Sequence, residues 1–138
     1  MQNIEKLLET GHTIKIKPQG WSMYPLIVYG RDSVIIEPLD TDRLKRGDVV
    51  LYRRKTGMFV LHRIYRITSD GIFLVGDNQT EIEGPLEFSQ VKGKMTAVVR
   101  KGKTVTTKNL IYVIYRCIWL RLLPLRPVIG KMIHKIKR

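Results

Sequence analysis

Pro18-Gln-Gly-Trp-Ser-Met-Tyr-Pro25 places one serine, Ser22, on a segment that is suited to a tight bend. Gly20 can adopt backbone angles that are closed to other residues, while Pro25 fixes its own φ angle and favours an extended Tyr24. A serine presented in this way can act as a nucleophile. It can equally be part of an ordinary turn, so the rest of the chain must decide between the two.

The sequence around this bend alternates between apolar and polar residues, which is typical of β-strands. Strands are predicted at 14–16, 34–37, 49–52, 59–67, 72–75, 95–100 and 103–107, with turn residues between them. Because long helices do not alternate with these strands, the sequence predicts a mainly β, antiparallel domain. A short helix with Ile4, Leu7 and Leu8 on one face precedes it, and Gly11 can end that helix.

The length of 138 residues and the apolar content of 43% are sufficient for one hydrophobic core. We expect a β domain over residues 1–107 and a basic, helical extension over residues 108–138. Cys117 is the only cysteine, which excludes an intrachain disulfide, and we expect it to be buried. No phosphate-binding loop, zinc spacing or dinucleotide motif occurs, so neither a cofactor nor a metal is expected.

Five short motifs in a fixed order give Ser22 a specific interpretation. They are Gly20-Trp-Ser-Met-Tyr-Pro25, Gly30-Arg-Asp-Ser-Val34, Arg46-Gly-Asp-Val-Val50, Leu61-His-Arg-Ile64 and Gly76-Asp-Asn78. Together they resemble the signal peptidase I and LexA-type serine peptidases, especially small signal-peptidase-like members. The resemblance implies a serine endopeptidase that cleaves a leader, signal or precursor peptide.

Within this superfamily the general base is either a lysine or a histidine. Bacterial signal peptidases and LexA-type repressors use lysine, but no lysine lies between Thr56 and Val91 here. His62 occupies the corresponding position, as in the endoplasmic-reticulum and archaeal type. Neutral imidazole, with a pKa of about 6.5, suits the activation of a serine near neutral pH. We therefore expect Ser22 as nucleophile and His62 as base.

A carboxylate is expected to orient the imidazole. If Asp70 and Gly71 are the central residues of a hairpin turn, His62 faces Gln79 and Asp77 lies diagonally on the same face, about 7–8 Å away. Asp77 is therefore the predicted third member of the site. A register shift of one residue would put the two on opposite faces. The alternative acid is Glu83, because eukaryotic-type relatives often carry a further acid after the Gly-Asp-Asn motif.

The surroundings of Ser22 suggest how a substrate is held. Many signal peptidases carry a serine hydroxyl two residues before the nucleophile, but this chain has Gly20 there. The oxyanion is therefore expected to bind the backbone N–H at Ser22. Gly20, Met23 and Tyr24 are expected to line the substrate cleft, although core packing explains Met23 and Tyr24 almost as well.

Positive charge is concentrated in the C-terminal part of the chain. Residues 88–138 contain 13 of the 25 basic residues and none of the 12 acidic ones. This pattern favours an anionic partner: acidic lipid, an acidic protein or nucleic acid. Nucleic acid is disfavoured because no base-stacking pattern of aromatic residues accompanies the basic ones. The alternative function is a non-catalytic, peptidase-like module that binds an acidic membrane, a partner protein, another copy of the chain or nucleic acid through this extension.

Membrane contact without a membrane span is expected for the extension. The alternative for residues 110–123 is that they pack back onto the β domain or onto a second subunit as part of the core. Residues 110–123 are largely apolar, but Arg116 and Arg121 limit the charge-free run to six residues, against about 20 for a spanning helix. Residues 128–138 alternate apolar and basic side chains as an interfacial helix does. Near the N-terminus, Glu5, Lys6 and Glu9 interrupt any signal-peptide core. We expect a cytoplasmic protein that is peripheral at the inner face of the membrane.

Overall fold

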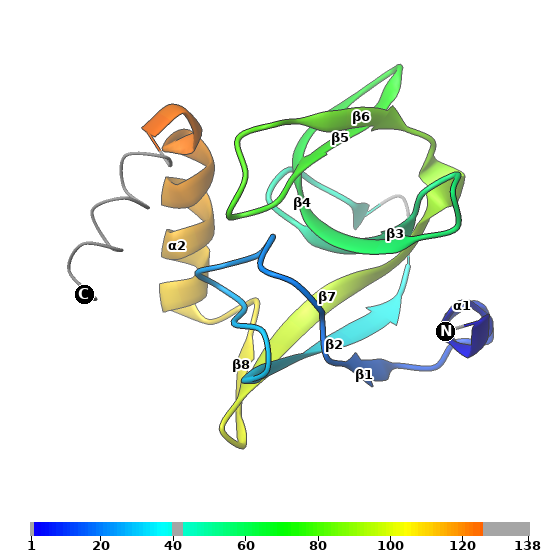
Figure 1. Cartoon of the computed structure of the whole chain (residues 1–138), viewed down its shortest axis with the longest axis horizontal. Coiled ribbons are helices and arrows are strands. Elements are labelled where there is room, and N and C mark those ends of the chain that lie inside the picture. Colours follow the sequence, from blue (N-terminus) through cyan, green and yellow to red (C-terminus); the bar gives the residue numbers. More distant parts are fainter. Residues whose placement is uncertain (1, 40–42, 126–138) are drawn as a thin grey trace.

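The computed structural model describes residues 2–39 and 43–125, which form a strongly curved antiparallel sheet between two helices (Figure 1). The strands are β1 (Ile14–Ile16), β2 (Asp32–Pro38), β3 (Val49–Arg53), β4 (Phe59–Thr68), β5 (Gly71–Val75), β6 (Glu83–Leu86), β7 (Val91–Arg100) and β8 (Lys103–Thr106). The helices are α1 (Gln2–Glu9) and α2 (Leu110–Arg121), with 3-10 turns at Phe88–Gln90 and Leu123–Leu125. The mainly β fold is therefore confirmed.

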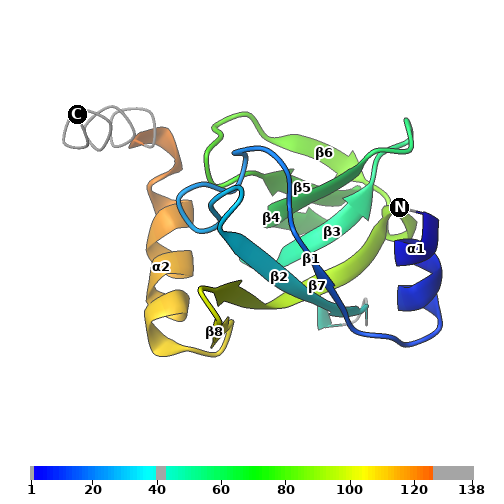
Figure 2. The same cartoon turned by 60° about the horizontal axis from the view of Figure 1, so that its bottom comes forward.

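The long strand β7 joins the two halves of the sheet. The strand order is β1-β2-β7-β3-β4-β5-β6, and β8 also pairs with β7. One edge of β7 pairs with β2, while the opposite edge pairs with β3 near its start and with β8 near its end. This arrangement curls the sheet around its core and leaves α1 and α2 at opposite ends of the molecule (Figures 1 and 2).

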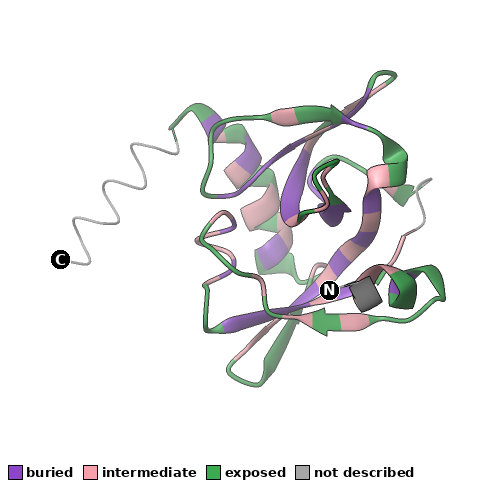
Figure 3. Cartoon of the chain, turned by 45° about the vertical axis from the view of Figure 1, so that its right-hand side comes forward, coloured by how far each residue is buried: buried purple, intermediate pink, exposed green. Residues whose placement is uncertain are grey.

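The core consists of two main apolar clusters on the two sides of the central strands. On β3, Val49 and Leu51 belong to the first cluster, whereas Val50 and Tyr52 belong to the second. Both faces of β3 are therefore buried, which explains its continuous apolar sequence. Figure 3 shows buried residues along the inner strands and exposed residues at the turns and hairpin tips. A smaller cluster of Val75, Leu120 and Leu123 attaches α2 to the sheet.

Most of the predicted strands are present, but β6 was not predicted. Its sequence, Glu83-Gly-Pro-Leu86, contains two residues that normally indicate a turn. Proline removes a backbone donor, and such a residue is tolerated at the edge of a sheet. Because β6 is the last strand in the sheet order, its proline fits that position.

The predicted register of the β4–β5 hairpin is wrong. Thr68 pairs with Gly71, so the turn consists of Ser69 and Asp70 and not of Asp70 and Gly71. Gly71 is the first residue of β5, and only glycine fits there because a side chain would collide with the carbonyl oxygen of Leu86 on β6. A register shift between Ile64 and Arg66 then pairs Arg63 with Val75. As a result Arg63, and not His62, lies on the face that carries Asp77.

Helix α2 begins at a regular N-cap, since the Asn109 side chain accepts hydrogen bonds from the N–H groups of Ile111 and Tyr112. Cys117 on this helix is exposed, so the expectation that it is buried is wrong. No helix in the described part of the chain is long and apolar enough to cross a bilayer. The interfacial helix expected at 128–138 lies outside the described residues.

The crossing of β2 and β7 supplies a stability prediction. A Cβ atom on Gly93 would collide with the Ile36 side chain and lie 3.0 Å from the Glu37 carbonyl oxygen. Ile36 is fully buried and cannot move aside. We expect Gly93→Ala to lower the free energy of unfolding by about 1–3 kcal/mol, measured by urea denaturation. Thr104→Ala on the exposed strand β8 is the control, and an equal effect of both variants would contradict this account.

Candidate active site

Ser22 lies on the loop between β1 and β2, and the Gly76-Asp-Asn78 segment holds this loop from one side. The Asn78 N–H donates a 2.8 Å hydrogen bond to the Ser22 carbonyl oxygen. A Cβ atom on Gly76 would lie 2.5 Å from that same oxygen, so only glycine permits the close approach. The first and last motifs found in the sequence are therefore in direct contact.

Ser22 and His62 both line an open cleft of about 920 Å³. Gly20 and Met23 also line it, whereas Tyr24 does not belong to its wall. Much of the remaining wall is apolar and comes from β1, β3 and β4, and the cationic side chains of Lys17, Arg53 and Arg54 lie along it. The hydroxyl of Ser22 has no hydrogen-bond partner among the described residues, His62 included.

A chain of hydrogen bonds connects His62 to a carboxylate through a tyrosine. The Nδ1 atom of His62 lies 3.0 Å from the Tyr52 hydroxyl, and that hydroxyl donates a 2.9 Å hydrogen bond to Oε1 of Glu83. Arg54 donates two hydrogen bonds to Glu83, of 2.7 Å and 3.0 Å. Burial would raise the pKa of Glu83, but the hydrogen bonds from Arg54 and Tyr52 outweigh it and lower that pKa.

The direction of these hydrogen bonds fixes the tautomer of His62. An ionised Glu83 can only accept, so the single Tyr52 hydroxyl proton points to Glu83. The Tyr52 oxygen must then accept from His62, which places the imidazole proton on Nδ1. The lone pair is left on Nε2, which has no partner among the described residues. Because no fully buried side-chain nitrogen in the described part of the chain lacks a partner, Nε2 is not fully enclosed, and His62 lines the cleft.

His62 is kept neutral by its surroundings. Burial lowers the pKa of His62 to about 4, and Arg54 adds to this effect, while Glu83 and Asp77 oppose it. The imidazole is thus unprotonated throughout the neutral range. Burial likewise raises the pKa of the Tyr52 hydroxyl, with the Glu83 carboxylate adding to the shift, so Tyr52 keeps its proton.

Asp77 does not contact His62, as the register shift in β4 dictates. Its carboxylate instead forms a two-pronged ion pair with Arg63, at 2.8 Å and 2.9 Å, and both side chains are fully buried. Burial lowers the pKa of Arg63, but the negative charge and the hydrogen bonds of Asp77 outweigh it, so that pKa is raised. Asp77 therefore holds the loop that contacts Ser22, and it forms no hydrogen bond with His62.

Helix α2 closes this ion pair on its outer side. The Tyr115 hydroxyl donates to the Asp77 carboxylate, and the Trp119 indole N–H donates to the Asp77 carbonyl oxygen, each at 2.8 Å. Arg63 also donates to the Gly47 carbonyl oxygen and to the Tyr112 hydroxyl. A continuous path of short contacts thus runs from α2 through Asp77 and Asn78 to the backbone of Ser22.

Three polar residues of this region had no role in the sequence interpretation: Tyr52, Arg54 and Arg63. Val50 pairs with His62, so Tyr52, two residues further along β3, lies diagonally across from the histidine on the same face. The sequence predicted both strands but not how they pair. The pairing of Val50 with His62, which is set by the turn that follows Arg53, is what brings Tyr52 close to the histidine.

Comparison with known proteins supports the superfamily indicated by the motifs. A family model described as Peptidase S24-like matches residues 2–105, which includes Ser22, His62, Asp77 and Glu83. No curated protein and no solved structure matches the chain. The matched region covers most of the sheet and ends before α2. Since it extends over far more than half of the 138 residues, the chain belongs to the Peptidase S24-like family.

Proposed function

We propose that this chain is a serine endopeptidase that cleaves a leader, signal or precursor peptide, with Ser22 as nucleophile and His62 as general base. One observation carries the proposal. The hydrogen-bond chain from Glu83 through Tyr52 leaves the base form of Nε2 open to the cleft that Ser22 also lines. A histidine that is buried only for packing does not require that its proton be held on Nδ1 and its lone pair left on Nε2.

The proposed reaction follows from these positions. Nε2 of His62 removes the hydroxyl proton of Ser22, and the oxygen attacks the carbonyl carbon of the scissile peptide bond. The Ser22 N–H, which donates to no described backbone oxygen, stabilises the resulting oxyanion. The imidazolium then gives its proton to the leaving amine. Water takes the place of the amine: His62 removes a proton from the water, the water oxygen attacks the acyl-enzyme ester, and the Ser22 oxygen regains its proton as it leaves.

Tyr52 and Glu83 would act as positioning residues in this scheme. They hold the proton on Nδ1 and lower the energy of the imidazolium that forms when Nε2 accepts a proton. Glu83, the alternative acid in the sequence interpretation, would orient His62 indirectly, through the Tyr52 hydroxyl. Asp77 would contribute differently, by fixing the loop whose Asn78 N–H binds the Ser22 carbonyl group.

The cleft is suited to an extended peptide. Strand β1 is the first strand of the sheet order and has one unpaired edge, and Ile16 and Lys17 at its end line the cleft. A peptide can add to such an edge by backbone hydrogen bonds. Apolar wall residues such as Leu51 and Leu61 would then receive its side chains.

Covalent labelling tests the proposal without a known substrate. We expect a fluorophosphonate probe to modify the wild-type protein at Ser22, located by tryptic mass spectrometry, with no modification of Ser22→Ala. His62→Gln should label at least roughly 1,000-fold more slowly, because the hydroxyl loses its base. Ser33→Ala is the control serine variant. A folded wild-type protein that resists the probe would leave the non-catalytic binding module as the better interpretation.

The low pKa of His62 predicts an unusual pH profile. With a pKa of about 4, about 97% of the imidazole is neutral at pH 5.5, against about 9% for an ordinary histidine. Lowering the pH from 7.5 to 5.5 should therefore slow the labelling of Ser22 less than twofold, instead of about tenfold. The rate should fall only as the pH approaches 4. A midpoint between pH 6 and 7 in protein that remains folded would refute the proposed protonation state.

The positioning residues can be distinguished from the structural ion pair. Tyr52→Phe removes the acceptor of the Nδ1 proton, so we expect labelling to slow roughly 10- to 100-fold, with a loss of stability of about 1–3 kcal/mol from the unsatisfied buried donor. Asp77→Asn leaves Arg63 buried without its counter-charge and should lower the free energy of unfolding by about 3–5 kcal/mol. Labelling rates and thermal unfolding are measured for both variants, with Tyr29→Phe as the control. Unchanged labelling of Tyr52→Phe would exclude its positioning role.

A further inference from the structure

Helix α2 has an outer face of large apolar side chains that no described element covers. Leu110 and Ile111 are 72% and 78% exposed, and Ile114 and Ile118 are 49% and 50% exposed. These positions recur every three or four residues, so they form one stripe. Leu125 in the following 3-10 turn is also largely exposed. A contiguous apolar patch of this kind indicates an interaction site.

The helix cannot hide this stripe by rotating. Its opposite face is occupied by Tyr115 and Trp119, which bind Asp77, and by Leu120, which belongs to the cluster with Val75. Helix α2 lies at one end of the molecule, away from α1 (Figures 1 and 2). The outer face is therefore held outward by contacts on the inner face.

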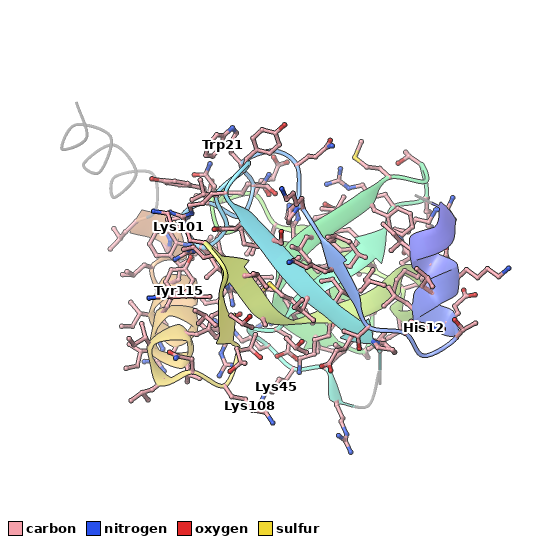
Figure 4. All side chains as sticks on the ribbon, turned by 90° about the horizontal axis from the view of Figure 1, so that it is seen from below. His12, Trp21, Lys45, Lys101, Lys108 and Tyr115 are labelled. Carbon is pink, nitrogen blue, oxygen red and sulfur yellow. The ribbon has the colours of Figure 1, made fainter. Side chains whose placement is uncertain are left out.

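The charge around the helix selects the kind of partner. Lys101 and Lys108 are exposed at the end of the molecule where α2 lies (Figure 4), and Arg121 is exposed on α2 itself. No acidic residue occurs after Glu87, and the net charge of the chain is +13. A second copy would bring the same positive charge to this end, which disfavours self-association. An anionic surface both attracts these residues and accepts apolar side chains.

We propose that the outer face of α2 docks on a membrane surface containing anionic lipids. The apolar stripe enters the boundary between headgroups and acyl chains, and the neighbouring lysine and arginine side chains contact the lipid phosphates. The helix has 12 residues, which corresponds to about 18 Å and is too short to span a hydrocarbon core of about 30 Å. It therefore lies along the surface. This proposal does not depend on the peptidase activity.

Docking would also connect the membrane to the loop that carries Ser22. The inner face of α2 binds Asp77, and the adjacent Asn78 binds the Ser22 carbonyl group. The element that touches lipid is thus two contacts away from the proposed nucleophile.

Vesicle flotation with the full chain tests the proposal. We expect binding to vesicles of phosphatidylcholine with 30% phosphatidylglycerol at low salt, much weaker binding to pure phosphatidylcholine, and release by 0.5 M NaCl. The double variant Ile114→Ser/Ile118→Ser should bind anionic vesicles at least roughly tenfold more weakly. The single variant Ile111→Ser, at the most exposed position, should show a smaller loss in the same direction.

Matched controls separate the competing explanations. Phe88→Ser removes an apolar side chain of 40% exposure on the short 3-10 turn before β7 and should leave binding unchanged. Thermal unfolding checks that every variant is folded. The proposal fails if the full chain ignores anionic vesicles, or if the isoleucine variants bind as well as wild type, since the basic residues alone would then suffice. It also fails if size-exclusion chromatography shows a dimer that the variants dissociate, or if duplex DNA binding depends on the same isoleucines.

Discussion

The buried ion pair of Arg63 and Asp77 is the interaction on which the geometry around Ser22 depends. Both side chains are inaccessible to solvent, and each of the three guanidinium nitrogens of Arg63 has a hydrogen-bond partner. Removing two charges from water is expensive, so such a pair adds little net stability by itself. Its effect here is geometric, because it joins β4, the loop after β5 and α2. That loop in turn fixes the backbone of Ser22.

In the proposed role of general base, His62 combines high availability with low basicity. Burial on β4 keeps His62 neutral, so nearly every molecule has an imidazole ready to accept a proton at neutral pH. The same low pKa makes it a weaker proton acceptor than an ordinary histidine. Glu83 partly offsets this weakness, since its charge favours the imidazolium. Tyr52 lies between Glu83 and His62 and keeps the carboxylate at a distance from the ring. The carboxylate can therefore orient the imidazole through Tyr52 while the imidazole stays unprotonated at neutral pH.

The sequence predicted the elements of the fold better than the contacts between them. Strand alternation is local, and for this reason seven of the eight strands, the N-terminal helix and the serine bend could be located. The β4–β5 register depends on the close approach of β6 to Gly71, which is a tertiary effect, and the shift before Arg66 moved Asp77 from His62 to Arg63. Glu83 was considered as an acid, but its connection through Tyr52 required the β3–β4 pairing. Strand β6 was missed because its proline is tolerated only at an edge.

The aromatic residues of α2 have a consequence for where the functional unit of this chain ends. The region shared with the family stops at residue 105, yet Tyr112, Tyr115 and Trp119 hydrogen-bond to Arg63 and Asp77 and cover one side of this ion pair. A fragment designed from the shared region alone would expose the ion pair to water. The boundary of the family match and the boundary of the cooperatively folded unit therefore differ, and a recombinant or chimeric version of this domain has to include α2.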